Sequence, residues 1–128
     1  MRSQMGEAFY NTLTGTHDAT SAGAETWEGR DVMSSVADEM AQKGIDMTGM
    51  RSTVLTRKMF DAADKVIWFP TPYMPSYVRE STKAKLWDVS DPWYMPDDGT
   101  NYVRRARDRI EKYVHELIQG GNDEKTKK

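Results

Sequence analysis

Asp64-Lys65-Val66-Ile67-Trp68-Phe69 is the stretch that decides the fold, because four apolar residues follow two charged ones. A short apolar run of this kind predicts a strand that is buried on both faces of a parallel sheet. Prolines at positions 70, 72 and 75 then make residues 70–77 a loop, since each proline lacks an N–H donor and fixes φ. Two more short strands are predicted, at residues 84–89 and, ending in a turn, at residues 18–23.

Amphipathic helices surround these strands. Residues 3–14 and 31–43 repeat apolar side chains at helical spacing, and each segment is followed by a glycine. A shorter helix through Ala63 is predicted to begin after Thr56, whose hydroxyl makes a good N-cap. The first stripe consists of Met5, Ala8, Phe9 and Leu13, and the second contains Val32, Val36 and Met40.

The last helix is predicted over about 100–118, with Gly120-Gly121 ending it. Helices that alternate with short buried strands are typical of an α/β domain whose parallel sheet is covered on both faces. We therefore predict one domain over residues 1–119 and a flexible polar tail over residues 120–128. The apolar stripe of the last helix is Val103, Ala106, Ile110, Val114, Leu117 and Ile118.

The composition excludes several classes of protein. The 128 residues are 38% hydrophobic and carry a net charge of −2, which argues against disorder and against binding to duplex nucleic acid. No apolar run reaches the ~20 residues of a membrane span. The only histidines, His17 and His115, are far apart in the sequence and there is no cysteine, so neither a metal site nor a cofactor is expected. We expect a cytoplasmic protein.

An open α/β sheet binds ligands at the carboxyl ends of its strands. Two short motifs of this sequence are expected at that edge. Arg2-Ser3 opens the first helix, where free N–H groups and the helix dipole favour an anion and a guanidinium can grip phosphate with two donors. Asp91-Pro92 follows a predicted strand and offers a carboxylic acid to protonate a leaving oxygen, with Trp93 and Tyr94 as an aromatic wall. Taken singly, Arg2 is also consistent with a terminal arginine that has no function, and Asp91-Pro92 is also consistent with an ordinary turn.

Several segments in register make the chain resemble the low-molecular-weight protein tyrosine phosphatase family, which also contains the thioredoxin-coupled arsenate reductases. The resemblance covers nearly the whole chain, from the end of the family's C-x5-R-S loop to its final helix. The segments that carry it are Arg2-Ser3-Gln4-Met5-Gly6-Glu7-Ala8-Phe9, Ser21-Ala22-Gly23, Gly44-Ile45-Asp46, Arg51-Ser52, Trp87-Asp88, Asp91-Pro92 and Arg107-Asp108-Arg109-Ile110.

This resemblance implies a three-layer α/β fold with a four-stranded parallel sheet, and hydrolysis of phosphomonoesters through a cysteinyl-phosphate. It implies that Arg2 clamps the phosphoryl oxygens, that Ser3 supports the catalytic thiolate and that Asp91 is the general acid. Ser21 would support the loop from behind. The substrate would be a phosphorylated protein or a small phosphoester, or arsenate in a reductase. The aromatic residues that would line the mouth of the site are Trp93 and Tyr94.

The chain departs from the family's motif at the nucleophile, since none of its 128 residues is a cysteine. The family's cysteine lies six residues before the arginine, and the first strand, central in the sheet, leads into it. We therefore expect an N-terminally truncated domain that lacks this strand, is inactive as written and can self-associate through the uncovered sheet. A non-catalytic, oxyanion-binding or regulatory relative stays open. So does an arsenate reductase, although residues 70–90 contain none of the resolving cysteines that such reductases use.

Overall fold

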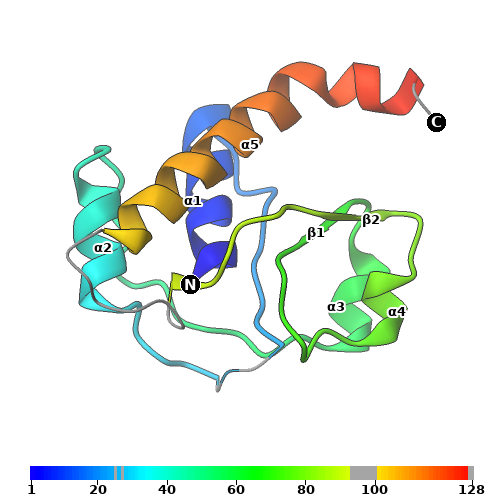
Figure 1. Cartoon of the computed structure of the whole chain (residues 1–128), viewed down its shortest axis with the longest axis horizontal. Helices are drawn as coiled ribbons and strands as arrows, with labels where there is room; N and C mark the ends of the chain where they lie inside the picture. Colours follow the sequence, from blue (N-terminus) through cyan, green and yellow to red (C-terminus); the bar gives the residue numbers. More distant parts are fainter. Residues whose placement is uncertain (25, 27, 93–100, 127–128) are drawn as a thin grey trace.

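Helices surround a small parallel sheet, so the predicted α/β class is confirmed, although three helices come before the first described strand. The computed structural model describes residues 1–24, 26, 28–92 and 101–126, without the side chains of residues 121–126. In Figure 1, the helices Arg2–Thr14, Ser34–Ala41 and Tyr102–Thr126 gather on one side of the view, and the strands lie on the other side with the helices Arg57–Ala62 and Ser76–Arg79. The elements are α1 (Arg2–Thr14), α2 (Ser34–Ala41), α3 (Arg57–Ala62), β1 (Val66–Trp68), α4 (Ser76–Arg79), β2 (Ala84–Leu86) and α5 (Tyr102–Thr126).

The sheet of the described residues consists of β1 and β2, which run parallel with Ile67 opposite Lys85. Both lie inside the predicted strands 64–69 and 84–89. The resemblance implies a four-stranded sheet, and the absence of a central strand stays a prediction. Phe69 and Trp87 follow the two strands and meet edge to face, with ring centroids 6.0 Å apart, which closes the carboxyl end of the sheet over the core.

The predicted strand over residues 18–23 is wrong except at its last residue, because only Gly23 forms a bridge, parallel to Val54. The side chains of α1 hold this segment in place of a strand ladder. Asn11 donates from Nδ2 to the carbonyl of Ala19 (3.0 Å) and accepts from the Ala19 N–H (2.9 Å). A backbone whose polar groups are satisfied by side chains has no need of a strand partner.

The helix ends follow local chemistry. Thr56 is the N-cap of α3, as predicted, and its hydroxyl accepts a hydrogen bond from the Met59 N–H (3.2 Å). Gly15 ends α1 in the left-handed conformation at φ 69°. The prediction that α5 ends at Gly120 is wrong, because the helix continues to Thr126 and Gly120 does not have a positive φ. A glycine weakens a helix but still donates its N–H, so it ends one only when the backbone turns left-handed.

The second helix begins three residues later than predicted, at Ser34, because Asp31 forms an antiparallel bridge with Arg51. Val32 therefore packs against the core from outside the helix. Whether residues 120–128 are a flexible tail stays a prediction. None of the described helices has the length and apolar character to cross a membrane.

The core lies where α1 and α2 pack against α5. Its most deeply buried side chains are at most 1% exposed and come almost entirely from the predicted stripes. Two members of those stripes, Leu13 and Ile118, are exposed; Leu13 lies in the last turn of α1, whereas Ile118 lies more than two turns before the end of α5. These most buried core residues are Met5, Phe9, Val36, Met40, Ile110 and Val114.

A charged network fastens α2 to α5. Glu39 is only 7% exposed and accepts hydrogen bonds from Arg104 Nε (2.9 Å), Arg107 Nη1 (3.1 Å) and Asn101 Nδ2 (2.8 Å). The hydrogen bond from Arg104, followed by the one from Asn101, holds the pKa of Glu39 below its usual value although burial opposes this. The network fixes the start of α5 beside α2.

Candidate functional site

Arg2 and Asp91, predicted from the sequence to lie near one another, are an ion pair. Arg2 is the first residue of α1 and is 8% exposed. Its Nη1 donates to the carbonyl of Val89 (2.7 Å), its Nη2 lies 3.6 Å from Asp91 Oδ2, and its Cζ lies 5.5 Å from the centroid of the Phe69 ring. The guanidinium therefore ties the start of α1 to the segments that follow both strands.

The topology explains this meeting point. Phe69 follows β1 directly, and Val89 to Asp91 follow β2. Because the strands are parallel, both segments leave from the same edge of the sheet. The N-terminus of α1 lies at that edge, and the first turn of a helix has N–H groups without intrahelical partners and a partial positive charge. A guanidinium at a helix N-terminus is suited to a tetrahedral oxyanion, and the neighbouring carboxylate competes with that anion for the guanidinium.

The two serines predicted for the site make other contacts. Ser3 Oγ donates to the carbonyl of Ala22 (3.4 Å), and Ser21 Oγ donates to Glu7 Oε1 (2.8 Å). Both fasten the segment before Gly23 to α1, and neither has a hydrogen bond with Arg2 or Asp91 among the contacts of the described residues. Their predicted roles, in supporting a thiolate and a loop, stay predictions.

The predicted aromatic wall, Trp93 and Tyr94, lies outside the described residues. Two features of the site were missed by sequence reasoning, the Val89 carbonyl and the Phe69 ring. Phe69 carried a usable signal, since it is the last apolar residue of a predicted strand and therefore lies at the ligand-binding edge. The Val89 carbonyl gave no such signal in the sequence, because every residue has a backbone carbonyl.

A groove of about 390 Å³ adjoins the Arg2–Asp91 pair, between the segment after β2 and the first turns of α5. We call it the α5 groove. It combines residues that are separated in the sequence, and sequence reasoning missed it for that reason. The residues that line it are Asp88, Val89, Ser90, Pro92, Tyr102, Arg105, Ala106 and Arg109.

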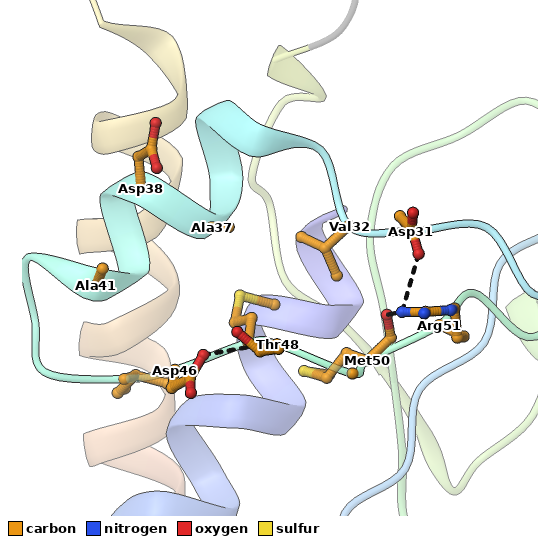
Figure 2. A pocket seen from close by; sticks show the side chains of 12 residues that line it. Asp31, Val32, Ala37, Asp38, Ala41, Asp46, Thr48, Met50 and Arg51 are labelled. Carbon is orange, nitrogen blue, oxygen red and sulfur yellow. Dashed lines mark hydrogen bonds and ion pairs between the residues drawn. The ribbon is translucent and has the colours of Figure 1, made fainter.

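A larger depression of about 520 Å³ lies beside α2 and contains none of the predicted site residues. Figure 2 shows Asp31 and Arg51 paired at one side of it, with an N–O distance of 2.9 Å, and Asp46 accepting a hydrogen bond from the Thr48 N–H at 2.8 Å. Hydrogen bonds from the Thr48 side chain and N–H hold the pKa of Asp46 below its usual value. Across the part of the chain that the structure describes, no three potential metal-binding side chains are grouped together.

The fold and the paired residues define an α/β protein with a candidate oxyanion site at the carboxyl edge of a parallel sheet. The sequence model of the low molecular weight phosphotyrosine protein phosphatase family matches residues 1–127. The chain belongs to this family, which confirms the resemblance. No curated protein is similar enough to count as a match.

Solved structures agree with this family. A low molecular weight protein tyrosine phosphatase from T. tengcongensis is 23% identical, with a TM-score of 0.75 over 92% of this chain and 90% of that one. An arginine phosphatase from Geobacillus stearothermophilus is also 23% identical, with a TM-score of 0.77 over 98% and 88%. An arsenate reductase in its phosphate-binding state is 28% identical, with a TM-score of 0.70 over 93% and 88%. At these identities the two phosphatases support the fold alone.

Proposed function

We propose that this chain binds the phosphoryl group of a phosphomonoester, on a protein or a small molecule, at the Arg2–Asp91 site. The observation that carries the proposal is the position of the Arg2 guanidinium, buried at the N-terminus of α1 and 3.6 Å from the Asp91 carboxylate. A buried cation beside a helix N-terminus binds an oxyanion more strongly than an exposed one, because less water screens the attraction.

The geometry of Arg2 leaves room for a competing anion. Its Nη1 is held by the Val89 carbonyl at 2.7 Å, which fixes the plane of the guanidinium. The distance of 3.6 Å between Nη2 and Asp91 Oδ2 is longer than an ordinary hydrogen bond, so this contact is a weak ion pair. A phosphoryl group at the first turn of α1 would take over that nitrogen and add hydrogen bonds from backbone N–H groups.

In the family's chemistry, the residue at the position of Asp91 is the general acid that protonates the leaving oxygen. The Asp91 side chain is 26% exposed, so a bound phosphoester can reach it. The nucleophilic step is different, because a cysteinyl-phosphate needs a thiolate and the sequence contains no cysteine. Ser3 follows the arginine instead of preceding it, so it is no substitute. We therefore expect these 128 residues to bind phosphoesters without hydrolysing them.

Arsenate reduction is the second candidate, since an arsenate reductase is 28% identical to the chain. Arsenate and phosphate are both tetrahedral oxyanions, so the same guanidinium would hold either one. The reductases of this family also depend on cysteine thiols, and the chain has none. Oxyanion binding is thus common to both candidates, and the thiol chemistry of each is absent from the residues in hand.

Calorimetric titration with inorganic phosphate and arsenate tests the proposal, with para-nitrophenyl phosphate as the hydrolysis substrate. Arg2→Lys should weaken binding of both anions about tenfold, because lysine cannot reach Val89 and the anion with separate nitrogens. Asp91→Asn should strengthen binding, because it removes the carboxylate that competes for Nη2. Asp88→Asn is the matched control, an exposed carboxylate three residues earlier.

Two outcomes would contradict the proposal. Equal phosphate affinities for the original chain and Arg2→Lys would exclude Arg2 as the anion ligand. Turnover of para-nitrophenyl phosphate by the 128 residues would show that a nucleophile other than cysteine operates, which the sequence gives no reason to expect.

A further inference from the structure

The four arginines near the start of α5 fall into two pairs with different surroundings. Arg104 and Arg107 are bound to Glu39, at 2.9 and 3.1 Å, and serve the contact between α2 and α5. Arg105 and Arg109 line the α5 groove instead. Neither of them forms an ion pair with any carboxylate in the described part of the chain. Two positive charges are thus presented to the groove, and no carboxylate of the described residues is paired with them.

The spacing of this second pair suits a shared ligand. Arg105 and Arg109 are four residues apart on a helix, so their side chains leave from the same face, one turn from each other. The Arg105 guanidinium lies 5.2 Å from the centroid of the Tyr102 ring, which supports the side chain in one position. Both side chains are exposed to solvent and can reach a ligand without rearrangement of the core.

The floor and walls of the groove show what kind of ligand fits. Val89 and Ala106 form an apolar floor that is nearly completely buried, so the aliphatic part of a side chain can lie on it. Among the described residues of the lining there is one carboxylate, Asp88, against two arginines. The groove therefore carries a net positive charge over an apolar base, which suits a side chain with a short apolar stem and a negative head.

The groove also has a fixed relation to the candidate oxyanion site. Ser90 and Pro92 line it, and Asp91, which pairs with Arg2, lies between them in the chain. A peptide with its phosphoryl group at Arg2 can therefore reach the groove with a residue close in sequence. We propose that the α5 groove binds a glutamate or aspartate side chain near the phosphorylated residue of a bound phosphoprotein. This inference rests on the proposed function, and it narrows the ligand to phosphoproteins with acidic flanking sequence.

Fluorescence anisotropy with four labelled peptides tests this inference. The first has phosphotyrosine flanked by glutamates, the second has glutamines in their place, and the third has unphosphorylated tyrosine with the glutamates. A fourth has phosphoserine in place of the glutamates. The glutamate phosphopeptide should bind about five- to tenfold more tightly than the glutamine one, as two partly exposed ion pairs allow, and the gap should narrow at high salt.

Variants on α5 assign that difference to the groove. The double variant Arg105→Gln with Arg109→Gln should abolish the preference for glutamate, while Lys112→Gln, which removes an exposed cation of the same helix outside the groove, should keep it. Both substitutions are at exposed positions, and circular dichroism checks that the helix is intact.

Each result has a separate meaning. Equal binding of the glutamate and glutamine phosphopeptides by the original chain, or a preference that survives the double variant, overturns the inference. If the phosphoserine peptide binds most tightly while the glutamate and glutamine phosphopeptides bind equally, the groove binds a second phosphate group. That result also overturns the inference. If the phosphorylated and unphosphorylated glutamate peptides bind equally while the double variant loses both, the groove stands and the proposed phosphoryl site fails.

Discussion

The helices α1, α2 and α5 and the strands β1 and β2 bury their apolar residues to very different extents, although Val78 of α4 is as buried as the helical core. In α1, α2 and α5 the central side chains, such as Phe9 and Ile110, are at most 1% exposed. In the sheet, all three residues of β1 are only half-buried, and Leu86 of β2 is 44% exposed. Figure 1 shows the two sides as separate groups of elements.

The difference follows from the lengths of the elements and from the open edge of β1. The hydrogen bonds from Val66 N to Lys83 O and from Trp87 N to Trp68 O show that these two β1 residues face β2. The polar groups of Ile67 therefore point the other way, and they have no partner in the described part of the chain. Self-association through this edge stays a prediction.

This comparison matters for the candidate site, which has one half on each side. Arg2 belongs to α1 and is anchored by the helical core, whereas Asp91 follows β2. Regions with few buried contacts open locally at lower free energy than a packed core. We therefore infer that the helical core fixes the position of the Arg2 guanidinium. Local opening of the segment after β2 then determines what fraction of the molecules has the Arg2–Asp91 ion pair formed.

Phe9→Ala is the change that should break the helical side. It removes a ring that is 1% exposed at the contact between α1 and α5, so it should lower the free energy of unfolding by about 3–5 kcal/mol. Urea denaturation followed by circular dichroism measures this. A loss below 1 kcal/mol would mean that the helical core is loosely packed and that the comparison is unfounded.

Glu39→Gln should have the next largest effect, about 2–3 kcal/mol, because it removes the charge that Arg104 and the buried Arg107 share, although Arg107 keeps its ion pair with Asp108. The folded pKa of Glu39 is depressed, so its contribution is present above the unfolded value of 4.5 and is lost as the pH falls through the lower folded value. The original chain should therefore lose stability more steeply than Glu39→Gln below about pH 4.5. Parallel pH profiles would reject this role of Glu39.

Ile67→Ala should cost less, about 1–2 kcal/mol, because the side chain in β1 is only half-buried. The companion measurement is hydrogen exchange, in which the Ile67 amide should exchange much faster than the Ile110 amide. Equal protection at the two positions would mean that the sheet opens only with the whole domain.

Gly120→Ala should have the smallest effect and the opposite sign, a gain of about 0.5–1 kcal/mol. Gly120 lies inside α5, and a β-carbon added there meets no atom within 4 Å. A loss of stability would indicate that the helix ends at this glycine, as the sequence pattern predicted.

The sequence predicted most of the helical side and less of the sheet side, for a physical reason. Helix formation depends on residues three and four apart, so stripes such as the one through Ile110 locate a helix from local sequence alone. Strand formation depends on a partner that is distant in the sequence. In residues 18–23 the backbone of Ala19 is instead hydrogen-bonded to the Asn11 side chain.

The site was predictable to a similar degree. Arg2 and Asp91 could be paired because a family motif and the rule for parallel sheets indicate the same edge. The α5 groove could not be predicted, since the spacing of Arg105 and Arg109 does not show that Glu39 binds their neighbours Arg104 and Arg107 instead.

The most direct test of the central claim is a map of phosphate-induced shifts in the amide NMR spectrum of the 128-residue chain. Saturable shifts should concentrate at the first turn of α1 and at residues 89–91, and Arg2→Lys should weaken both sets together. Shifts confined to one of these segments, or spread over the exposed cations of α5 with Arg2 unaffected, would contradict the claim that Arg2 and Asp91 form a single oxyanion site.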